Sequence, residues 1–130
     1  MREIVRAVLD GQGVRDAEIS LAFVDNATIQ QLNWRYLQHD APTDVLSFLL
    51  SETTAKNLAG ELVIGAEVAK AQAESRGHEV GAELALYVIH GLLHLCGYDD
   101  KTNKAAGEMR QRERHYLKQL SFPDIAPTEE

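Results

Sequence analysis

The stretch ALYVIHGLLHLCGYDD (residues 85–100) begins with a segment, ALYVIHGLLHL, that is apolar on nearly every side of a helical projection apart from two histidines. A helix that is apolar all round belongs in the interior of a domain, so residues 81–97 predict a buried central helix. Gly97 is the residue type that ends helices in a left-handed turn, and we expect the chain to fold back sharply there. The sequence therefore predicts a central helix followed at once by a tight turn.

The two histidines predict a metal site on this helix and turn. A four-residue step along a helix turns about 400° and rises about 6 Å, so His90 and His94 project from one face. The turn at Gly97 brings Asp100 round to the same point, giving the pattern H-x-x-x-H-x-x-G-x-x-D. This is the spacing of the metzincin zinc site, with an aspartate in place of the third histidine. Two imidazoles and one carboxylate leave a fourth position open, so we expect one Zn²⁺ per chain and a catalytic role for these residues through the metal.

A histidine pair on a buried helix is also compatible with ordinary core residues that have hydrogen-bond partners. Without partners, two imidazoles in this apolar helix would cost on the order of a few kcal/mol of desolvation. A metal bound to both removes that cost, which favours metal binding. Gly91 stands where the peptidase motif H-E-x-x-H carries its general base, so the sequence disfavours a peptidase.

Length and composition limit the remaining choices. The chain has 130 residues, 45% of them hydrophobic, without repeats or linkers, which predicts a single domain over residues 1–130 with a flexible tail over 121–130. No apolar run is long enough for a membrane span and the start lacks a signal-peptide layout. Together with a lone cysteine, Cys96, these features favour a cytoplasmic protein. The net charge of −7 disfavours binding of nucleic acid through bulk charge, so any RNA contact needs a local basic patch.

The rest of the chain mixes helix and strand patterns. Apolar spacing predicts helices around residues 4–9 and over 26–37, 67–77 and 104–120, and strand formers predict strands over 18–25, 44–50 and 61–65. This order predicts an α+β fold in which helices pack on a small mixed β-sheet. Asn26 is expected to cap the helix that it begins. Helical spacing favours a core position for Trp34, Tyr36 or both over a role in stacking on bases.

Three separated stretches resemble the YbeY family of endoribonucleases, which are also described as rRNA maturation factors. They are LNWRYLQHDAPTDVLSF (residues 32–48), GELVIGAEVAKAQAESRG (60–77) and HGLLHLCGYDD (90–100). The resemblance implies an α+β fold with a zinc site, and a role in processing small-subunit ribosomal RNA and in ribosome quality control. As partners it implies ribosomal RNA, the small ribosomal subunit and ribosome-associated proteins, with no role for DNA or a membrane.

Two departures from the family pattern affect the site. The family signature ends in histidine where this chain has Asp100; because a carboxylate also ligates zinc, Asp100 takes the role of third ligand, with Asp99 as the alternative. The family often has an arginine for phosphate handling after the aromatic residue of the first stretch, and this chain has Leu37 there. Arg35 is the candidate replacement for that catalytic role. It lies two residues earlier, about 200° round a helix, and would face away from the site unless the helix has ended by then.

Basic side chains elsewhere are candidates for contact with RNA phosphates. Arg76, Lys101 and Lys104 are expected near the site. The last helix carries Arg110, Arg112, Arg114, His115 and Lys118. Glu108 and Glu113 are interleaved with these bases, so a solvated, salt-bridged face is an equal alternative. Cys96, two positions from His94, is expected to point away from the metal as a buried thiol.

Two functions of different classes remain open. The first is a zinc-dependent endoribonuclease that acts on single-stranded parts of ribosomal RNA precursors, favoured by the open three-ligand site. The second is a ribosome-assembly factor in which zinc mainly organises the fold and nuclease activity is slight or absent. Leu37 and the acidic balance of the chain favour the second.

Overall fold

The computed structural model describes residues 1–51 and 57–126 and has the α+β fold that the sequence predicts. In chain order its elements are α1 (Arg2–Gly11), β1 (Asp16–Val24), α2 (Asn26–Leu37), β2 (Val45–Leu49), β3 (Asn57–Gly65), α3 (Ala66–Arg76), α4 (Val80–Leu95) and α5 (Asn103–Gln119). The expected elements are present, and β3 is longer than expected because it already begins at Asn57. Within the described ranges, no helix is long and apolar enough to cross a membrane.

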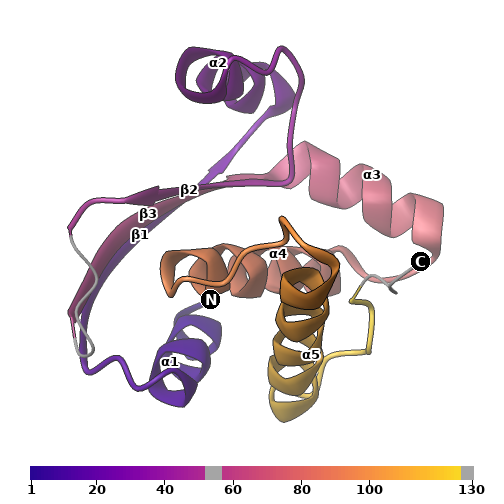
Figure 1. Cartoon of the computed structure of the whole chain (residues 1–130). Coiled ribbons are helices and arrows are strands. Elements are labelled where there is room, and N and C mark those ends of the chain that lie inside the picture. The colour runs from indigo at the N-terminus through magenta and orange to yellow at the C-terminus, as the bar shows by residue number, and fades with distance from the viewer. Residues whose placement is uncertain (52–56, 127–130) are drawn as a thin grey trace.

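The sheet is small and mixed, as predicted. Its strand order is β1-β3-β2, with β3 parallel to β1 and antiparallel to β2. One face of the sheet lies over α4, with α1 and α5 beyond it, and α2 lies on the opposite face (Figure 1). The central strand therefore has helices on both sides, which explains why β3 is buried along most of its length.

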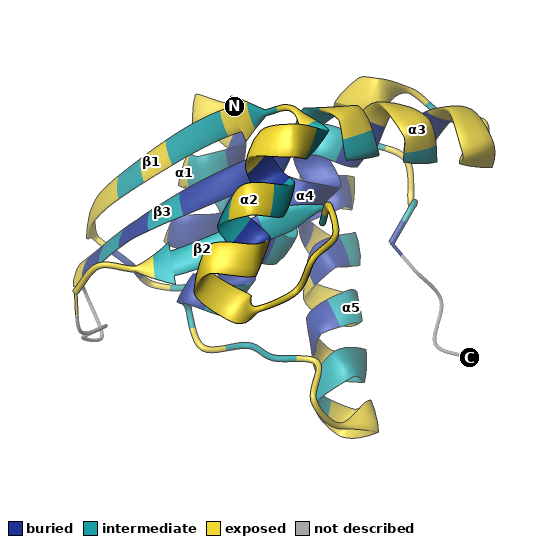
Figure 2. Cartoon of the chain, turned by 90° about the horizontal axis from the view of Figure 1, so that it is seen from above, coloured by how far each residue is buried: buried dark blue, intermediate teal, exposed yellow. Residues whose placement is uncertain are grey.

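Alternate side chains of β3 build two separate cores. Leu62 and Ile64 join the larger cluster, which the buried residues of α1, α4 and α5 complete. Val63 points to the other face, where it packs with Ile29 of α2 and Leu46 of β2. Seen from above, α2 crosses the sheet with an exposed outer face while α4 lies buried behind the strands (Figure 2). This division follows from the two-residue period of a strand, which sends neighbouring side chains to opposite faces.

Gly91 lets α4 approach the sheet closely. A Cβ atom at this position would lie 2.8 Å from Leu62 Cδ2 and 3.1 Å from Val45 Cγ2, so these side chains or the helix would have to shift to admit it. The Ser47 hydroxyl of β2 also donates a hydrogen bond to the Gly91 carbonyl oxygen at 3.3 Å. The position that would carry the general base of a peptidase is thus a packing contact. These contacts hold His90 and His94 close to the edge strand β2.

Two sequence expectations about α2 are wrong. The residue that caps α2 is Asp25, whose side chain accepts a hydrogen bond from the Thr28 backbone N–H at 2.8 Å, while the Asn26 N–H donates to Glu67 at 3.0 Å. Aspartate serves as well as asparagine at this position, so the helix simply takes its cap one residue earlier. Trp34 and Tyr36 are not core residues: they are 56% and 52% exposed. Ile29 and the neighbouring Leu32 instead supply the buried face of the helix.

The segment after α5 packs against the domain for much of its length. Phe122 and Ile125 contact the main core, and Ala126 is buried. Three residues of the expected flexible tail thus contact the domain, and the flexibility of the tail stays a prediction. Residues 127–130 of that expectation lie outside the described residues.

Candidate metal centre

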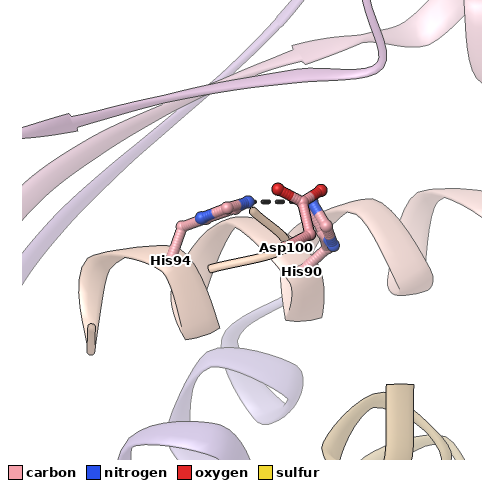
Figure 3. Close-up of side chains that lie close together, drawn as sticks. All are labelled: His90, His94 and Asp100. Carbon is pink, nitrogen blue, oxygen red and sulfur yellow. Dashed lines mark hydrogen bonds between the residues drawn. The ribbon is translucent and has the colours of Figure 1, made fainter. Parts of the chain in front are cut away.

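His90 and His94 lie on one face of α4, as their spacing predicts. Their Nε2 atoms are 3.1 Å apart, and the two rings stand edge to face with centroids 4.6 Å apart (Figure 3). Two imidazole nitrogens at this separation turn their metal-binding atoms toward a common point. The four-residue step along the helix is sufficient to produce this arrangement.

The turn after α4 brings Asp100 to the two histidines. Gly97 has a φ of +104°, and the helix closes with hydrogen bonds from Gly97 N–H to the His94 carbonyl and from Tyr98 N–H to the Leu93 carbonyl, both 3.0 Å. This Schellman arrangement requires the left-handed residue that glycine supplies. The ligand atoms of His90, His94 and Asp100 all lie within 4.8 Å of one another, close enough to hold one ion.

Asp99, the alternative ligand, is engaged elsewhere. Its Oδ1 accepts a hydrogen bond from the Lys101 backbone N–H at 3.0 Å, which stabilises the turn into α5. The carboxylate of Asp100 is exposed and faces the histidine pair (Figure 3). The geometry therefore favours Asp100 over its neighbour.

Glu113 of α5 contacts His90 at Nδ1, the ring nitrogen that does not face His94. Its carboxylate is fully buried, and Oε2 accepts a hydrogen bond from His90 Nδ1 at 3.0 Å. Arg110 Nη1 donates to both oxygens of the same carboxylate, at 2.8 Å from Oε2. A proton held on Nδ1 leaves the lone pair of Nε2 free, and this is the tautomer that metal binding on the His94 side requires.

The solvated, salt-bridged face considered as an alternative for the last helix does not include Glu113, which is fully buried although it pairs with Arg110. Buried residues of α5 are Met109, Glu113, Tyr116 and Leu117. Their helical spacing puts the glutamate on the apolar face of α5. That spacing is visible in the sequence, and a carboxylate within an apolar stripe is the signal that would have identified it.

The immediate surroundings of His94 favour its neutral imidazole. Burial, and then the charge of His90, lower the pKa of His94, although Asp100 acts in the opposite sense. Neutral imidazole is the form that binds metal. Cys96 is half-buried and packs against the main core, and burial raises the pKa of its thiol. It thus lies apart from the three ligand atoms, as expected.

The donor set fits zinc. Imidazole nitrogens and a carboxylate oxygen are usual zinc ligands, and three of them with one open position make a catalytic type of site. Two facing Nε2 atoms with one exposed carboxylate beside them leave an opening toward solvent. His90, His94 and Asp100 could therefore hold a metal ion.

Two cavities share His90 as a lining residue. The first has a volume of about 410 Å³, is largely polar, and is lined by Arg76, Tyr87, His90, Asp100 and Arg110 among others. The second, of about 360 Å³, lies on the other side and is lined by Leu37, Leu49, Leu95, His90 and His94 among others. The candidate metal centre thus stands between a polar and a more apolar compartment.

Comparison with known proteins identifies the family. The family model described as Endoribonuclease YbeY matches residues 1–121. The chain belongs to the YbeY family. Relatives named Endoribonuclease YbeY include one from Sulfurovum sp., 42% identical over 86% of this chain and 78% of the relative. Another, from Moorella thermoacetica, is 38% identical over 90% of this chain and 82% of the relative.

A solved structure shares the fold. The solution structure of TM1509 from Thermotoga maritima aligns with a TM-score of 0.66 and 27% sequence identity, covering 99% of this chain and 89% of the other. The resemblance drawn from three short stretches is therefore confirmed over residues 1–121.

The YbeY pattern predicted an arginine where this chain has Leu37, and the structure puts Leu37 on the wall of the second cavity. Arg35 is exposed, and its guanidinium carbon lies 5.5 Å from the ring centroid of Tyr36. Neither cavity described above includes Arg35 among its lining residues. Because α2 continues to Leu37, Arg35 does not turn toward the histidines, and its catalytic role stays a prediction.

The other basic candidates divide into two groups. Arg76 and Arg110 line the first cavity, whereas Lys101, Lys104 and Arg112 are exposed. Arg114 pairs with Asp124 at 3.4 Å. Arg110 is therefore the arginine of α5 that lines the cavity beside the candidate metal centre.

Proposed function

We propose that this YbeY-family chain is a zinc-dependent endoribonuclease that cuts single-stranded segments of ribosomal RNA precursors. The observation that carries the proposal is the open set of His90, His94 and Asp100, whose ligand atoms lie within 4.8 Å beside a cavity lined by two arginines. The family relatives named Endoribonuclease YbeY support the same reaction class.

The residues of the site suit hydrolysis of a phosphodiester. A zinc ion bound by the three ligands would act as a Lewis acid on a phosphodiester oxygen and lower the pKa of a water molecule toward about 7. Glu113 holds His90 in the tautomer that presents Nε2 to the site. Asp100 brings a negative charge that a histidine would not, and this lowers the acidity of the centre relative to a three-histidine site. We therefore expect activity to need a somewhat higher pH than a three-histidine variant.

The biological setting follows from the family. The proposed substrate is small-subunit ribosomal RNA in the cytoplasm, and the proposed partners are the small ribosomal subunit and ribosome-associated proteins. A contribution to ribosome quality control belongs to the same proposal. DNA and membranes are not part of it.

A second candidate function is a ribosome-assembly factor in which zinc mainly organises the fold. Leu37 favours it, because this side chain brings no positive charge to the second cavity. The net charge of −7 favours it as well. The two functions differ in whether the zinc-loaded protein cuts RNA.

Metal analysis and RNA cleavage on one preparation test the proposal. We expect about one zinc per chain by elemental analysis, and cleavage of a single-stranded oligoribonucleotide that stops after chelation and returns with added zinc. His90→Ala should abolish both, whereas His115→Ala, which removes an exposed histidine of α5, should keep both. Zinc at one per chain with no cleavage would favour the assembly factor, and failure to take up zinc would overturn both candidates.

A further inference from the structure

Arg110 reaches from α5 into the first cavity, beside His90 and Asp100. Its side chain is 19% exposed, and Nη1 donates both of its hydrogen bonds to Glu113. Within residues 1–51 and 57–126, the other guanidinium nitrogens have no hydrogen-bond partner. Arginine carries five N–H donors in a rigid fork, so donors remain for a ligand in the cavity.

Glu113 fixes both Arg110 and a predicted metal ligand. Because it is fully buried and bonded to His90 and Arg110, the guanidinium is held in place before any ligand arrives. Fixing a long side chain in advance removes most of the entropy cost of its later contact. The Glu113 carboxylate thus fixes the position of the Arg110 guanidinium relative to the candidate metal centre.

Arg76, the other arginine of the cavity, is held less firmly. Its side chain is 46% exposed, and its nearest acidic partner, Glu83, is 3.8 Å away. A loosely held surface arginine contributes mainly charge, whereas a fixed fork contributes geometry as well. Arg110 is therefore the better candidate for a specific contact.

The charge of the cavity depends on the metal. Asp44, Asp100 and Glu113 line it against Arg76 and Arg110, so carboxylates outnumber arginines. A divalent ion at the histidines reverses this balance. A phosphate ligand is then attracted, and Arg110 lies beside the ion to receive it.

We propose that Arg110 binds a phosphate of the RNA strand next to the metal centre, positioned for this contact by Glu113. The inference rests on the proposed function and names the residue that recognises the backbone of its substrate. A planar guanidinium is suited to paired hydrogen bonds with two phosphate oxygens. Recognition of this kind reads the backbone and not the base sequence.

The test compares four zinc-loaded proteins: wild type, Arg110→Gln, Arg110→Lys and Arg112→Gln. Arg112→Gln is the matched control, because it removes the same charge from an exposed position of the same helix. Fluorescence anisotropy measures the affinity for a single-stranded oligoribonucleotide at several salt concentrations, and zinc content, melting temperature and cleavage are recorded on the same samples.

We expect Arg110→Gln to weaken RNA binding about tenfold and to lower the magnitude of the salt slope by about 0.7, the value for one lost contact to a single strand. Arg110→Lys should restore the slope but only part of the affinity, because lysine keeps the charge and loses the fork. Arg112→Gln should change affinity by less than about twofold. Zinc content should be unchanged in all three variants.

Equal weakening by Arg110→Gln and Arg112→Gln would overturn the proposal, since bulk charge would then explain the effect. Loss of zinc from Arg110→Gln would also overturn it, because the effect would run through Glu113 and His90. If that variant does not fold, Arg110→Lys decides, and wild-type affinity in it contradicts the contact.

The same samples separate this inference from the proposed function. If Arg110→Gln binds RNA more weakly than wild type and none of the proteins cleaves it, the result supports the Arg110 contact and contradicts the endoribonuclease proposal. If wild type cleaves RNA and Arg110→Gln binds RNA as tightly as wild type, the result supports the endoribonuclease proposal and contradicts the Arg110 contact. In a chelated wild type, RNA affinity should fall at least about tenfold, and unchanged affinity there contradicts the dependence on metal.

Discussion

Two fully buried glutamates, Glu83 of α4 and Glu113 of α5, each contact a histidine and an arginine. Glu83 binds His78, which precedes α4, and lies 3.8 Å from Arg76 of α3. His78 and Glu83 are five positions apart in the sequence, and their contact stabilises the turn between α3 and α4. Burial and the charge of Glu83 also raise the pKa of the Tyr87 hydroxyl. Glu83, His78 and Arg76 form a trio of neighbouring residues that stabilises the local structure.

The trio around Glu113 joins residues that are distant in sequence. His90 and Glu113 are 23 positions apart, and their contact links α4 to α5. The Nε2 atom of His90 faces His94 at 3.1 Å, so the same chemistry that closes a turn at Glu83 orients a predicted metal ligand at Glu113. Both histidines contact a buried glutamate, so this contact does not distinguish them. The surroundings of the other ring nitrogen decide whether the histidine is a structural residue or a predicted metal ligand.

The strongest way to break this comparison is to remove one histidine on each side. His90→Ala should lose zinc, because two donors remain where three are needed. His78→Ala should keep one zinc per chain and lose about 2 kcal/mol of unfolding free energy, since Glu83 loses a buried partner. Elemental analysis after gel filtration and urea unfolding of the metal-free proteins provide the two readouts. Equal zinc loss in both variants would contradict the difference between the trios.

A substitution series at Asp100 sharpens the role of the third ligand. Asp100→Ala should weaken zinc binding strongly and end RNA cleavage, because only two imidazoles remain. Asp100→His should retain zinc and keep or raise cleavage, since imidazole also binds zinc and removes a negative charge. Competition with a chromogenic chelator measures the affinity of the three proteins. Wild-type affinity in Asp100→Ala would exclude this carboxylate and return the role to Asp99.

The two glutamates provide the next smaller effect. Glu113→Gln should lower zinc affinity about tenfold to a hundredfold, as loss of a carboxylate behind a metal-bound histidine does. Glu83→Gln should leave zinc affinity within about twofold and lower only the melting temperature. The same chelator competition applies. A similar loss of affinity in both would mean that the two trios act through general stability.

The smallest effect concerns Cys96. Cys96→Ala should keep zinc, because the thiol packs on the core and not at the ligand atoms. Burial raises the pKa of the thiol, so the thiolate fraction at any given pH is below that of a free cysteine. Alkylation by iodoacetamide at pH 8 should accordingly be slower than for free cysteine, and should accelerate as the pH rises. Alkylation at the rate of free cysteine would contradict the burial of this side chain.

The parts of the site that were predictable depend on local geometry. His90, His94 and Asp100 come together through one helical step and one glycine turn, and these follow from the spacing of a single short stretch. The α+β fold and the mixed sheet were predictable as well, because each strand and helix carries its own periodicity.

The remaining features depend on contacts between distant segments. Glu113 reaches His90 only because α5 packs on α4; the apolar spacing of α5 indicates that Glu113 faces inward, but it does not indicate which residue Glu113 meets there. Trp34 and Tyr36 are exposed because the side of α2 that carries Ile29 and Leu32 covers the sheet. Arg76 and Arg110 line the polar cavity and Arg35 does not, because α3 and α5 come to this cavity from distant parts of the chain.

The most direct test is an anomalous difference map at the zinc absorption edge, from a crystal of the zinc-loaded protein. We expect one strong peak per chain at about 2.0–2.1 Å from the Nε2 atoms of His90 and His94 and about 2.0–2.2 Å from a carboxylate oxygen of Asp100. Glu113 should remain bonded to His90 Nδ1 and should not contact the ion. A peak elsewhere, or one that Asp100 does not touch, would contradict the assignment of the metal centre.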